Sequence, residues 1–164
     1  MKHLIALLTV ALLLVASHPV AADDAPAETY EQMVARAINY LKIKGQMDNG
    51  SYDASGKNIG VTALVTTAVM KHGRTPEDPL VAKSLKYLEK HIQPDGGIYT
   101  KGSLYRNYET CLSMLCFSEA NKDGRYDKVI AKADKFVKGI QWDGSEDADI
   151  DESHESFGGA GYGK

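Results

Sequence analysis

The sequence contains little cysteine and no excess of basic residues. Only two of its 164 residues are cysteines, Cys111 and Cys116, and 19 lysines and arginines stand against 22 aspartates and glutamates. Residues five apart on a helix point about 140° away from each other, so we do not expect a disulfide between these two cysteines. Nucleic-acid binding normally needs a clustered basic face, so the charge balance argues against nucleic acid as a partner.

The sequence also lacks an apolar run long enough for a comfortable membrane span. The run at residues 4–16 is shorter than the roughly 20 residues that a spanning helix needs. It follows Lys2 and precedes the small residues at 20–22, which is the pattern of a secretory signal peptide. We therefore predict a signal peptide at residues 1–22, cleavage after Ala22, export of the protein, and no membrane span once the peptide is removed. A retained N-terminal anchor is the alternative.

Signatures of common catalytic and cofactor sites are missing as well. The sequence contains no nucleophile motif of a serine or cysteine enzyme. The Gly-rich residues 158–163 follow no predicted strand, so they predict a turn and not a nucleotide site. We predict no cofactor and assign no catalytic residue, so whether the protein is an enzyme stays open.

An acidic stretch near the C-terminus contains weak candidates for metal ligands. Residues 146–155 hold six acids and no lysine or arginine, which is typical of a solvated loop. Asp147, Asp149 and Asp151 are weak calcium candidates, because alternating aspartates can present several oxygens to a hard cation. The stretch lacks the glycine and glutamate of an EF-hand, and we predict no metal site.

Three related loop sequences recur at nearly constant spacing. The first spans residues 46–52 and the second residues 91–99, while the third opens at Gln141 and is completed by residues 157–163. Their glutamines lie 47 and 48 residues apart, at Gln46, Gln93 and Gln141. A period of this size is typical of repeated helix pairs.

Hydrophobic periodicity predicts helices on both sides of these loops. Amphipathic helices are expected at 29–45, 79–92 and 126–140, and nearly uncharged helices at 59–70 and 108–117. Asp78 followed by Pro79 is a helix start signal, and Pro94 predicts that this helix stops at Gln93. We therefore predict an all-α fold of about two and a half helix pairs, each with an amphipathic outer and an apolar inner helix. Residues 23–28 form a leader, and residues 29–164 form the repeat domain.

The repeats resemble the QW motifs of squalene and oxidosqualene cyclases. Lys132-Ala133-x-x-Phe136-Val137-x-x-x-Gln141 matches the first half of such a motif, and the helices before Gln46 and Gln93 are similar. The family expects Gly-x-Trp after the glutamine, and here Gly50-Ser51-Tyr52 and Gly97-Ile98-Tyr99 place tyrosine in the tryptophan slot. Gly60-Val61-Thr62-Ala63-Leu64 and Asn107-Tyr108-x-Thr110 also resemble inner-helix starts of bacterial prenyltransferase-like and squalene-cyclase-like repeat proteins.

This resemblance covers residues 29–164 and implies an α/α toroid, in which inner helices line a central cavity and outer helices surround them. The chain would supply less than half of such a toroid, so we expect the N-terminal fragment of a longer protein, with the remainder of the toroid as its partner. An amide in the motif can satisfy free N–H groups at the start of a neighbouring helix. The resemblance therefore implies structural roles for the motif residues, which are Gln46, Gly50, Tyr52, Gln93, Gly97, Tyr99 and Gln141.

Three functions stay open at this point. The first is an exported squalene-cyclase-like or prenyltransferase-like protein whose inner helices line a pocket for an apolar or extended ligand. The second is a non-catalytic binding or scaffold module, and the third is a carbohydrate-active enzyme on a similar α/α barrel. Glu109, Cys111 and His154 resemble the zinc ligands of protein prenyltransferases only faintly, so they do not favour the transferase.

Overall fold

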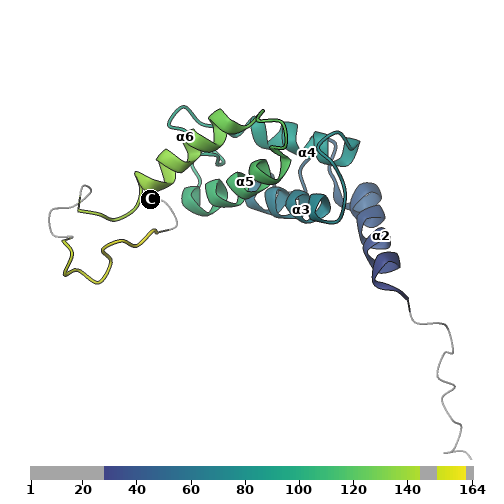
Figure 1. Ribbon diagram of the computed structural model, residues 1–164, viewed down its shortest axis with the longest axis horizontal. Coiled ribbons are helices and arrows are strands. Elements are labelled where there is room, and N and C mark those ends of the chain that lie inside the picture. Colours follow the sequence, from purple (N-terminus) through teal and green to yellow (C-terminus); the bar gives the residue numbers. More distant parts are fainter. Residues whose placement is uncertain (1–27, 145–150, 162–164) are drawn as a thin grey trace, which may run out of the picture.

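The computed structural model describes residues 28–144 and 151–161, and every regular element in these ranges is a helix (Figure 1). The all-α prediction is therefore confirmed. None of the described helices is both long and apolar enough to cross a bilayer. The predicted signal peptide and nearly all of the leader lie outside the described residues. The elements are α2 (Tyr30–Tyr40), its π-helical continuation η1 (Leu41–Gly45), α3 (Ile59–Lys71), α4 (Pro79–Glu89), α5 (Arg106–Ala120) and α6 (Asp127–Lys138).

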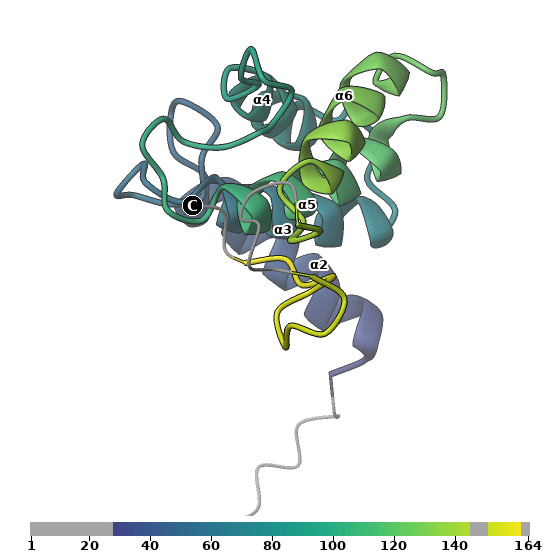
Figure 2. The same cartoon turned by 90° about the vertical axis from the view of Figure 1, so that its left-hand side faces the viewer.

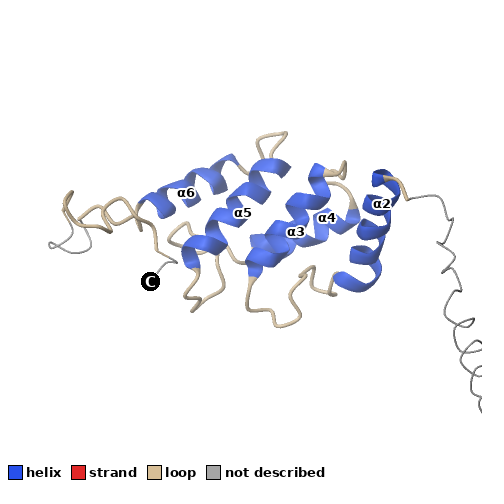
Figure 3. Cartoon of the chain, turned by 90° about the horizontal axis from the view of Figure 1, so that it is seen from below, coloured by secondary structure: helices blue, strands red, loops and turns tan. Residues whose placement is uncertain are grey.

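The helices form two layers. α3 and α5 lie side by side in one layer, and α4 and α6 lie over them in the other (Figure 1, Figure 2). α2 lies at one end of the array, and α6 lies toward the other (Figure 3). Inner and outer helices thus alternate from α3 to α6 (Figure 2). Each amphipathic helix, with the loop and the inner helix that follow it, makes one repeat. The third repeat consists, within the described residues, of α6 and a loop.

Local sequence signals start the outer helices. The Thr29 hydroxyl accepts a hydrogen bond from the Gln32 N–H (3.3 Å), and the Gln32 side chain accepts one from the Thr29 N–H (2.9 Å), forming a capping box for α2. At α4, the Asp78 carboxylate accepts from the Leu80 N–H (2.9 Å), and Pro79 occupies the first helical position. The start predicted for α4 is therefore confirmed.

α4 ends earlier than the sequence predicts. Its last residue is Glu89, whereas Pro94 predicts an end at Gln93. The chain leaves the helix because Ile92 pairs with Ile98 across the following loop, and the Gln93 N–H donates to the Gly97 carbonyl oxygen (2.8 Å). Ile92 still packs against the core, but from this short bridge. A contact across the loop therefore overrides the helical periodicity.

The core lies between the two layers. Its fully buried side chains include Ile59 of α3, Leu88 of α4 and Phe117 of α5. Burial of each such side chain contributes about 1.5–3 kcal/mol. Cys116 lies in the same core, where burial raises the pKa of its thiol to about 12. Cys111 and Cys116 are both free thiols, as the sequence predicts.

Candidate functional site

The first two loops close with the same backbone hydrogen bonds. In the first loop, the Met47 N–H donates to the Ser51 carbonyl (2.8 Å), and the Gly50 N–H donates to the Met47 carbonyl (3.0 Å). Gly50 and Gly96, which take the same place in the first and second loops, both have positive φ, as a tight turn of this kind requires. The same two bonds recur in the second loop at Gln93, Gly96 and Gly97.

The alignment of the loops on their glutamines is therefore one residue out of register. It pairs Tyr52 with Tyr99, whereas the structure pairs Tyr52 with Ile98. The Tyr52 N–H donates to the hydroxyl of Thr62, and the Ile98 N–H donates to the hydroxyl of Thr110, each at 3.0 Å. Two consecutive glycines in the second loop hide this shift in the sequence, because either can match Gly50.

The third loop closes in the same way across the acidic stretch. The Trp142 N–H donates to the Gly159 carbonyl (2.8 Å), and the Gly158 N–H donates to the Trp142 carbonyl (2.6 Å). Gln141 forms an isolated bridge with Ala160. The Gly-rich stretch therefore completes the loop that opens at Gln141, as the sequence predicts.

Gln46 joins the first loop to α4, but with the opposite hydrogen-bond polarity to the one expected. Its side-chain amide donates to the Leu80 carbonyl (2.8 Å) and to the Ser84 hydroxyl (2.9 Å), so in the described part of the chain it bonds to α4 as a donor. The Ser84 hydroxyl in turn donates to the Gly50 carbonyl (2.9 Å). The reason is that Asp78 already caps α4, so an acceptor is not needed there.

The other two glutamines bond within their own loops. The Gln93 side chain donates to the carbonyls of His91 (3.1 Å) and Tyr99 (2.8 Å). The Gln141 side chain donates to the Gly158 carbonyl (2.7 Å). The three amides therefore hold the loops in shape, and only that of Gln46 reaches a neighbouring helix among the described bonds.

Close backbone approach explains the glycines at the loop tips. Gly50 (φ +98°) faces the carbonyl of Lys83 in α4, and Gly96 (φ +93°) faces the carbonyl of Lys132 in α6. A Cβ at either glycine would clash with that carbonyl. Each loop therefore docks its repeat directly onto the backbone of the next outer helix.

The two tyrosines pack between their loop and the next outer helix. Burial raises the pKa of Tyr52 to about 12, and its hydroxyl interacts with Ser84 of α4. The Tyr99 ring lies 5.6 Å from the ring of Phe136 in α6, and its hydroxyl donates to the Asp95 carboxylate (2.5 Å). Burial, followed by the Asp95 charge, raises the pKa of Tyr99 as well. Neither phenol therefore ionises near neutral pH, and both serve packing.

A buried carboxyl group in the first turn of α5 is the strongest candidate for chemistry. Glu109 is fully buried, and one of its oxygens accepts a hydrogen bond from the Thr100 N–H (2.8 Å). Its other oxygen, Oε1, has no hydrogen-bond partner in the described part of the chain. Burial raises its pKa, although the Thr100 N–H and the Ser103 hydroxyl act in the opposite direction. A signal was present in the sequence, because Glu109 is an acid in a nearly uncharged helix, at the position where the first repeat has Val61.

A cavity of about 360 Å³ opens at the loop that leads into α5. The Arg106 guanidinium lies 5.8 Å from the centroid of the Tyr99 ring on its wall. With two cationic side chains and several hydrogen-bonding groups, the wall suits a polar or anionic group. Its lining residues are Gln93, Tyr99, Lys101, Gly102, Ser103, Leu104 and Arg106.

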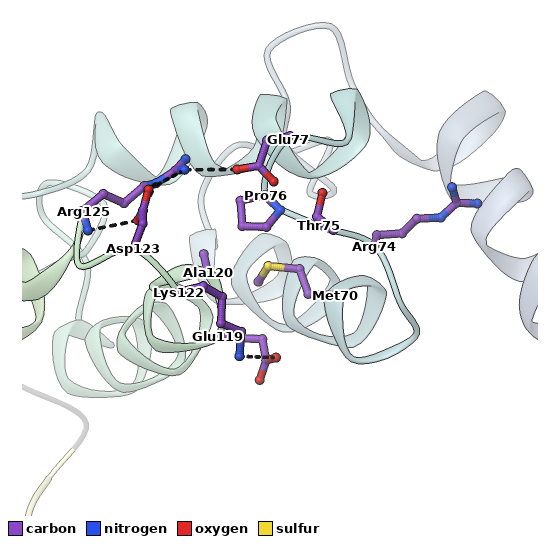
Figure 4. A pocket seen from close by; sticks show the side chains of 10 residues that line it. All are labelled: Met70, Arg74, Thr75, Pro76, Glu77, Glu119, Ala120, Lys122, Asp123 and Arg125. Atoms are coloured by element: carbon purple, nitrogen blue, oxygen red, sulfur yellow. Dashed lines mark hydrogen bonds and ion pairs between the residues drawn. The ribbon is translucent and has the colours of Figure 1, made fainter.

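A second cavity, of about 300 Å³, lies at the C-terminal ends of α3 and α5 (Figure 4). Figure 4 shows Arg125 between Glu77 and Asp123. Its guanidinium forms ion pairs with Glu77 (3.1 Å) and Asp123 (2.8 Å). Glu119, at the same cavity, pairs with Lys71 at 3.1 Å. These charges neutralise one another between neighbouring repeats, so we interpret this cavity as a joint of the scaffold.

The metal candidates from the sequence do not form a site in the described residues. Asp147 and Asp149 lie outside them. Asp151 is described, and its carboxylate accepts from the N–H (2.8 Å) and hydroxyl (2.6 Å) of Ser153, which lower its pKa. Within residues 28–144 and 151–161, no three His, Cys, Asp or Glu side chains are grouped to hold a metal ion. The faint zinc set that includes His154 is therefore not assembled.

The inner helices expose an apolar surface, which we call the inner face. Leu64 of α3 is 56% exposed and Tyr108 of α5 is 44% exposed, and the partly buried Leu112 lies one turn after Tyr108 on α5. Gly60 lies under this surface, where a Cβ would approach Leu112 and Tyr108 to 3.1 Å. On α3, Leu64 points about opposite to the buried Thr62, so the inner face lies away from the outer helices.

Comparison with protein family models, curated proteins and solved structures finds no match to this chain.

Proposed function

We propose that this chain belongs to an exported squalene-cyclase-like or prenyltransferase-like repeat protein, in which the inner face binds an apolar or extended ligand. The exposed apolar side chains of the inner face are the observation that carries this proposal. Leu64 lies one helical turn after Gly60 on α3, and Gly60 lies against Tyr108 and the partly buried Leu112 of α5. Contiguous exposed apolar surface marks a site of binding more often than scattered single residues do.

The same surface favours a ligand with one polar end. Leu104 and Tyr105, just before α5, are two more exposed apolar side chains, at 71% and 52%. Lys101 and Arg106 line the cavity beside them. An acyl or prenyl chain on the inner face would therefore place an anionic head group next to two cations.

Titration of the full chain with a fluorescent long-chain fatty acid tests this proposal. We expect saturable binding that weakens by about tenfold in Leu64→Asn and in Leu112→Asn, since each removes apolar contact area. Ile43→Asn is the matched control, because Ile43 is also exposed, at 62%, but lies in η1 at the end of α2. Absence of binding, or an equal loss in the control, would reject the proposal.

Export is part of the same proposal and depends on residues 1–22. Their basic start, apolar run and small residues before Asp23 are the supporting pattern. We expect the mature protein, isolated from outside the cytoplasm, to begin at Asp23. N-terminal sequencing measures this directly, and a protein that retains Met1 contradicts it.

A further inference from the structure

The first loop contains a dipeptide that can react with itself. Asn49 precedes Gly50, and this is the only Asn-Gly pair in the sequence. In such a pair the glycine nitrogen can attack the amide carbon of the asparagine side chain, because glycine has no Cβ to hinder the approach. The new carbon–nitrogen bond closes a succinimide ring, and the side-chain nitrogen leaves as ammonia with the proton of the glycine N–H. Water then opens the ring at either of its carbonyl groups, which gives aspartate or isoaspartate.

The folded loop holds both reacting groups in hydrogen bonds. The Gly50 N–H donates to the Met47 carbonyl (3.0 Å), and the Asn49 side-chain oxygen accepts from the Ser51 N–H (2.9 Å). Gly50 is buried, whereas Asn49 is exposed. The attacking nitrogen must lose its proton, so its bond to Met47 has to break first. The bond from Ser51 also restrains the rotation of the side chain that the attack needs. The closed loop therefore suppresses the reaction.

Helix α4 keeps Gly50 in this position. Gly50 lies directly against the Lys83 carbonyl, and its own carbonyl accepts a hydrogen bond from the Ser84 hydroxyl (2.9 Å). Ser84 in turn accepts from the Gln46 side chain (2.9 Å). The Gly50 N–H can therefore be released only when the loop separates from α4. The reaction is thus coupled to the joint between the first and second repeats.

The second loop shows what an aspartate at position 49 would do. Asp95 takes the place of Asn49 in that loop, directly before the docking glycine. Its carboxylate accepts from the Gly97 N–H (2.9 Å), as the Asn49 side chain does from the Ser51 N–H. Aspartate can therefore replace Asn49 without loss of the bond that shapes the loop.

We propose that Asn49 is a site of spontaneous deamidation, and that opening of the joint between the first loop and α4 controls its rate. The proposal is independent of any ligand of the inner face. In isoaspartate the main chain runs through the side-chain carbon and is one carbon longer, so the turn can no longer hold Gly50 against Lys83. The aspartate product closes the joint again, whereas the isoaspartate product leaves it open.

Incubation of the full chain at mildly alkaline pH, followed by peptide mass spectrometry, tests the proposal. The readout is the rate at which the Asn49 amide is converted to acid, with the aspartate and isoaspartate peptides separated by chromatography. We expect the folded wild type to react at least about tenfold more slowly than the same chain unfolded in guanidinium chloride, since the reaction waits for the loop to open. Ser84→Ala and Gln46→Ala should each raise the rate in the folded protein by about tenfold, since each weakens the joint.

Tyr99→Phe is the matched control, since it removes one hydroxyl bond from the second loop as Ser84→Ala does from the first joint. It should leave the rate at Asn49 unchanged, and circular dichroism establishes that each variant is folded. Asn49→Asp should unfold at the same guanidinium concentration as the wild type, and the isolated isoaspartate product at a lower one. Equal rates in the folded and unfolded chains, no increase in either joint variant, an equal increase in the control, or an isoaspartate product as stable as the wild type would each overturn the proposal.

Discussion

At the scale of single residues, the loop glycines are explained by what they touch. Gly50, Gly96 and Gly102 all have positive φ, a conformation that costs other residues free energy. Gly50 and Gly96 also lie against the carbonyl of a neighbouring helix, whereas Gly102 has no atom within 4 Å of the position of a Cβ. The glycines at 50 and 96 therefore serve the joint between repeats, and the one at 102 serves only its turn.

Replacing Gly96 by alanine should separate these two effects. We expect Gly102→Ala to reduce the free energy of unfolding by about 1 kcal/mol, since only backbone strain is added. Gly96→Ala should reduce the free energy of unfolding by about 2–4 kcal/mol, since its methyl group must also displace α6. Urea titration of both variants measures the difference. Equal losses would show that the approach to Lys132 carries no constraint.

The buried carboxyl of Glu109 should make stability depend on pH. Burial raises its pKa in the folded protein above the ordinary value of 4.5, so between those two values the folded state holds the proton and the unfolded chain does not. The contribution of the protonated Glu109 to the free energy of unfolding is therefore fully present below pH 4.5. It is lost as the pH rises through the folded-state pKa. Glu109→Gln removes this titration, so its stability relative to the wild type should improve from acidic to neutral pH.

Urea titrations in a pH series check this expectation. Glu31→Gln on the exposed side of α2 controls for the loss of one carboxyl group. If the free energy of unfolding of Glu109→Gln differs from that of the wild type by the same amount at every pH, then Glu109 does not titrate in this way.

At the scale of elements, the first loop and α4 are held together by one small polar network. Ser84 accepts from the Gln46 amide and donates to the Gly50 carbonyl, and it is fully buried between them. Buried groups that lose such a partner cost more than exposed ones, because water cannot replace the bond. This network therefore couples the end of the first repeat to the start of the second.

Ser84→Ala should reduce the free energy of unfolding by about 1–3 kcal/mol, since it leaves the partly buried Gln46 amide and the buried Gly50 carbonyl with one bond fewer each. Ser118→Ala, at an exposed position of α5, should change it by less than about 0.5 kcal/mol. In a double-mutant cycle with Gln46→Ala, the double variant should lose less free energy of unfolding than the sum of the two single losses. Strict additivity would show that Gln46 and Ser84 are not coupled.

At the scale of the whole molecule, stability should be graded along the array. α3 packs on α4 and α5, and α5 also packs on α6, whereas the only buried residue of α2 is Ile38. Repeat arrays gain their stability from contacts between neighbours, so an end helix with one neighbour has the lowest local stability.

We therefore expect amide hydrogens of α2 to exchange faster than those of α3 and α5 in dilute protein. Native-state hydrogen exchange measures this by helix. Uniform protection of all helices in dilute solution would contradict the graded stability.

The sequence by itself determined the helical class, the alternation of outer and inner helices, and the starts at Thr29 and Pro79. Apolar periodicity and capping residues act within a few positions of the chain, so they can be read without the fold. The closing of the third loop by its glycines was also predictable, because its sequence repeats that of the first two loops.

Only the tertiary structure decided the register of the second loop, the early end of α4 and the partners of Gln46. It also decided that Glu109 is buried with one oxygen unpaired. Each of these depends on residues that lie far apart along the chain: Ile92 leaves the helix to meet Ile98, and Gln46 meets a helix that Asp78 has already capped. Local pattern cannot contain such contacts, because they exist only after the repeats have packed together.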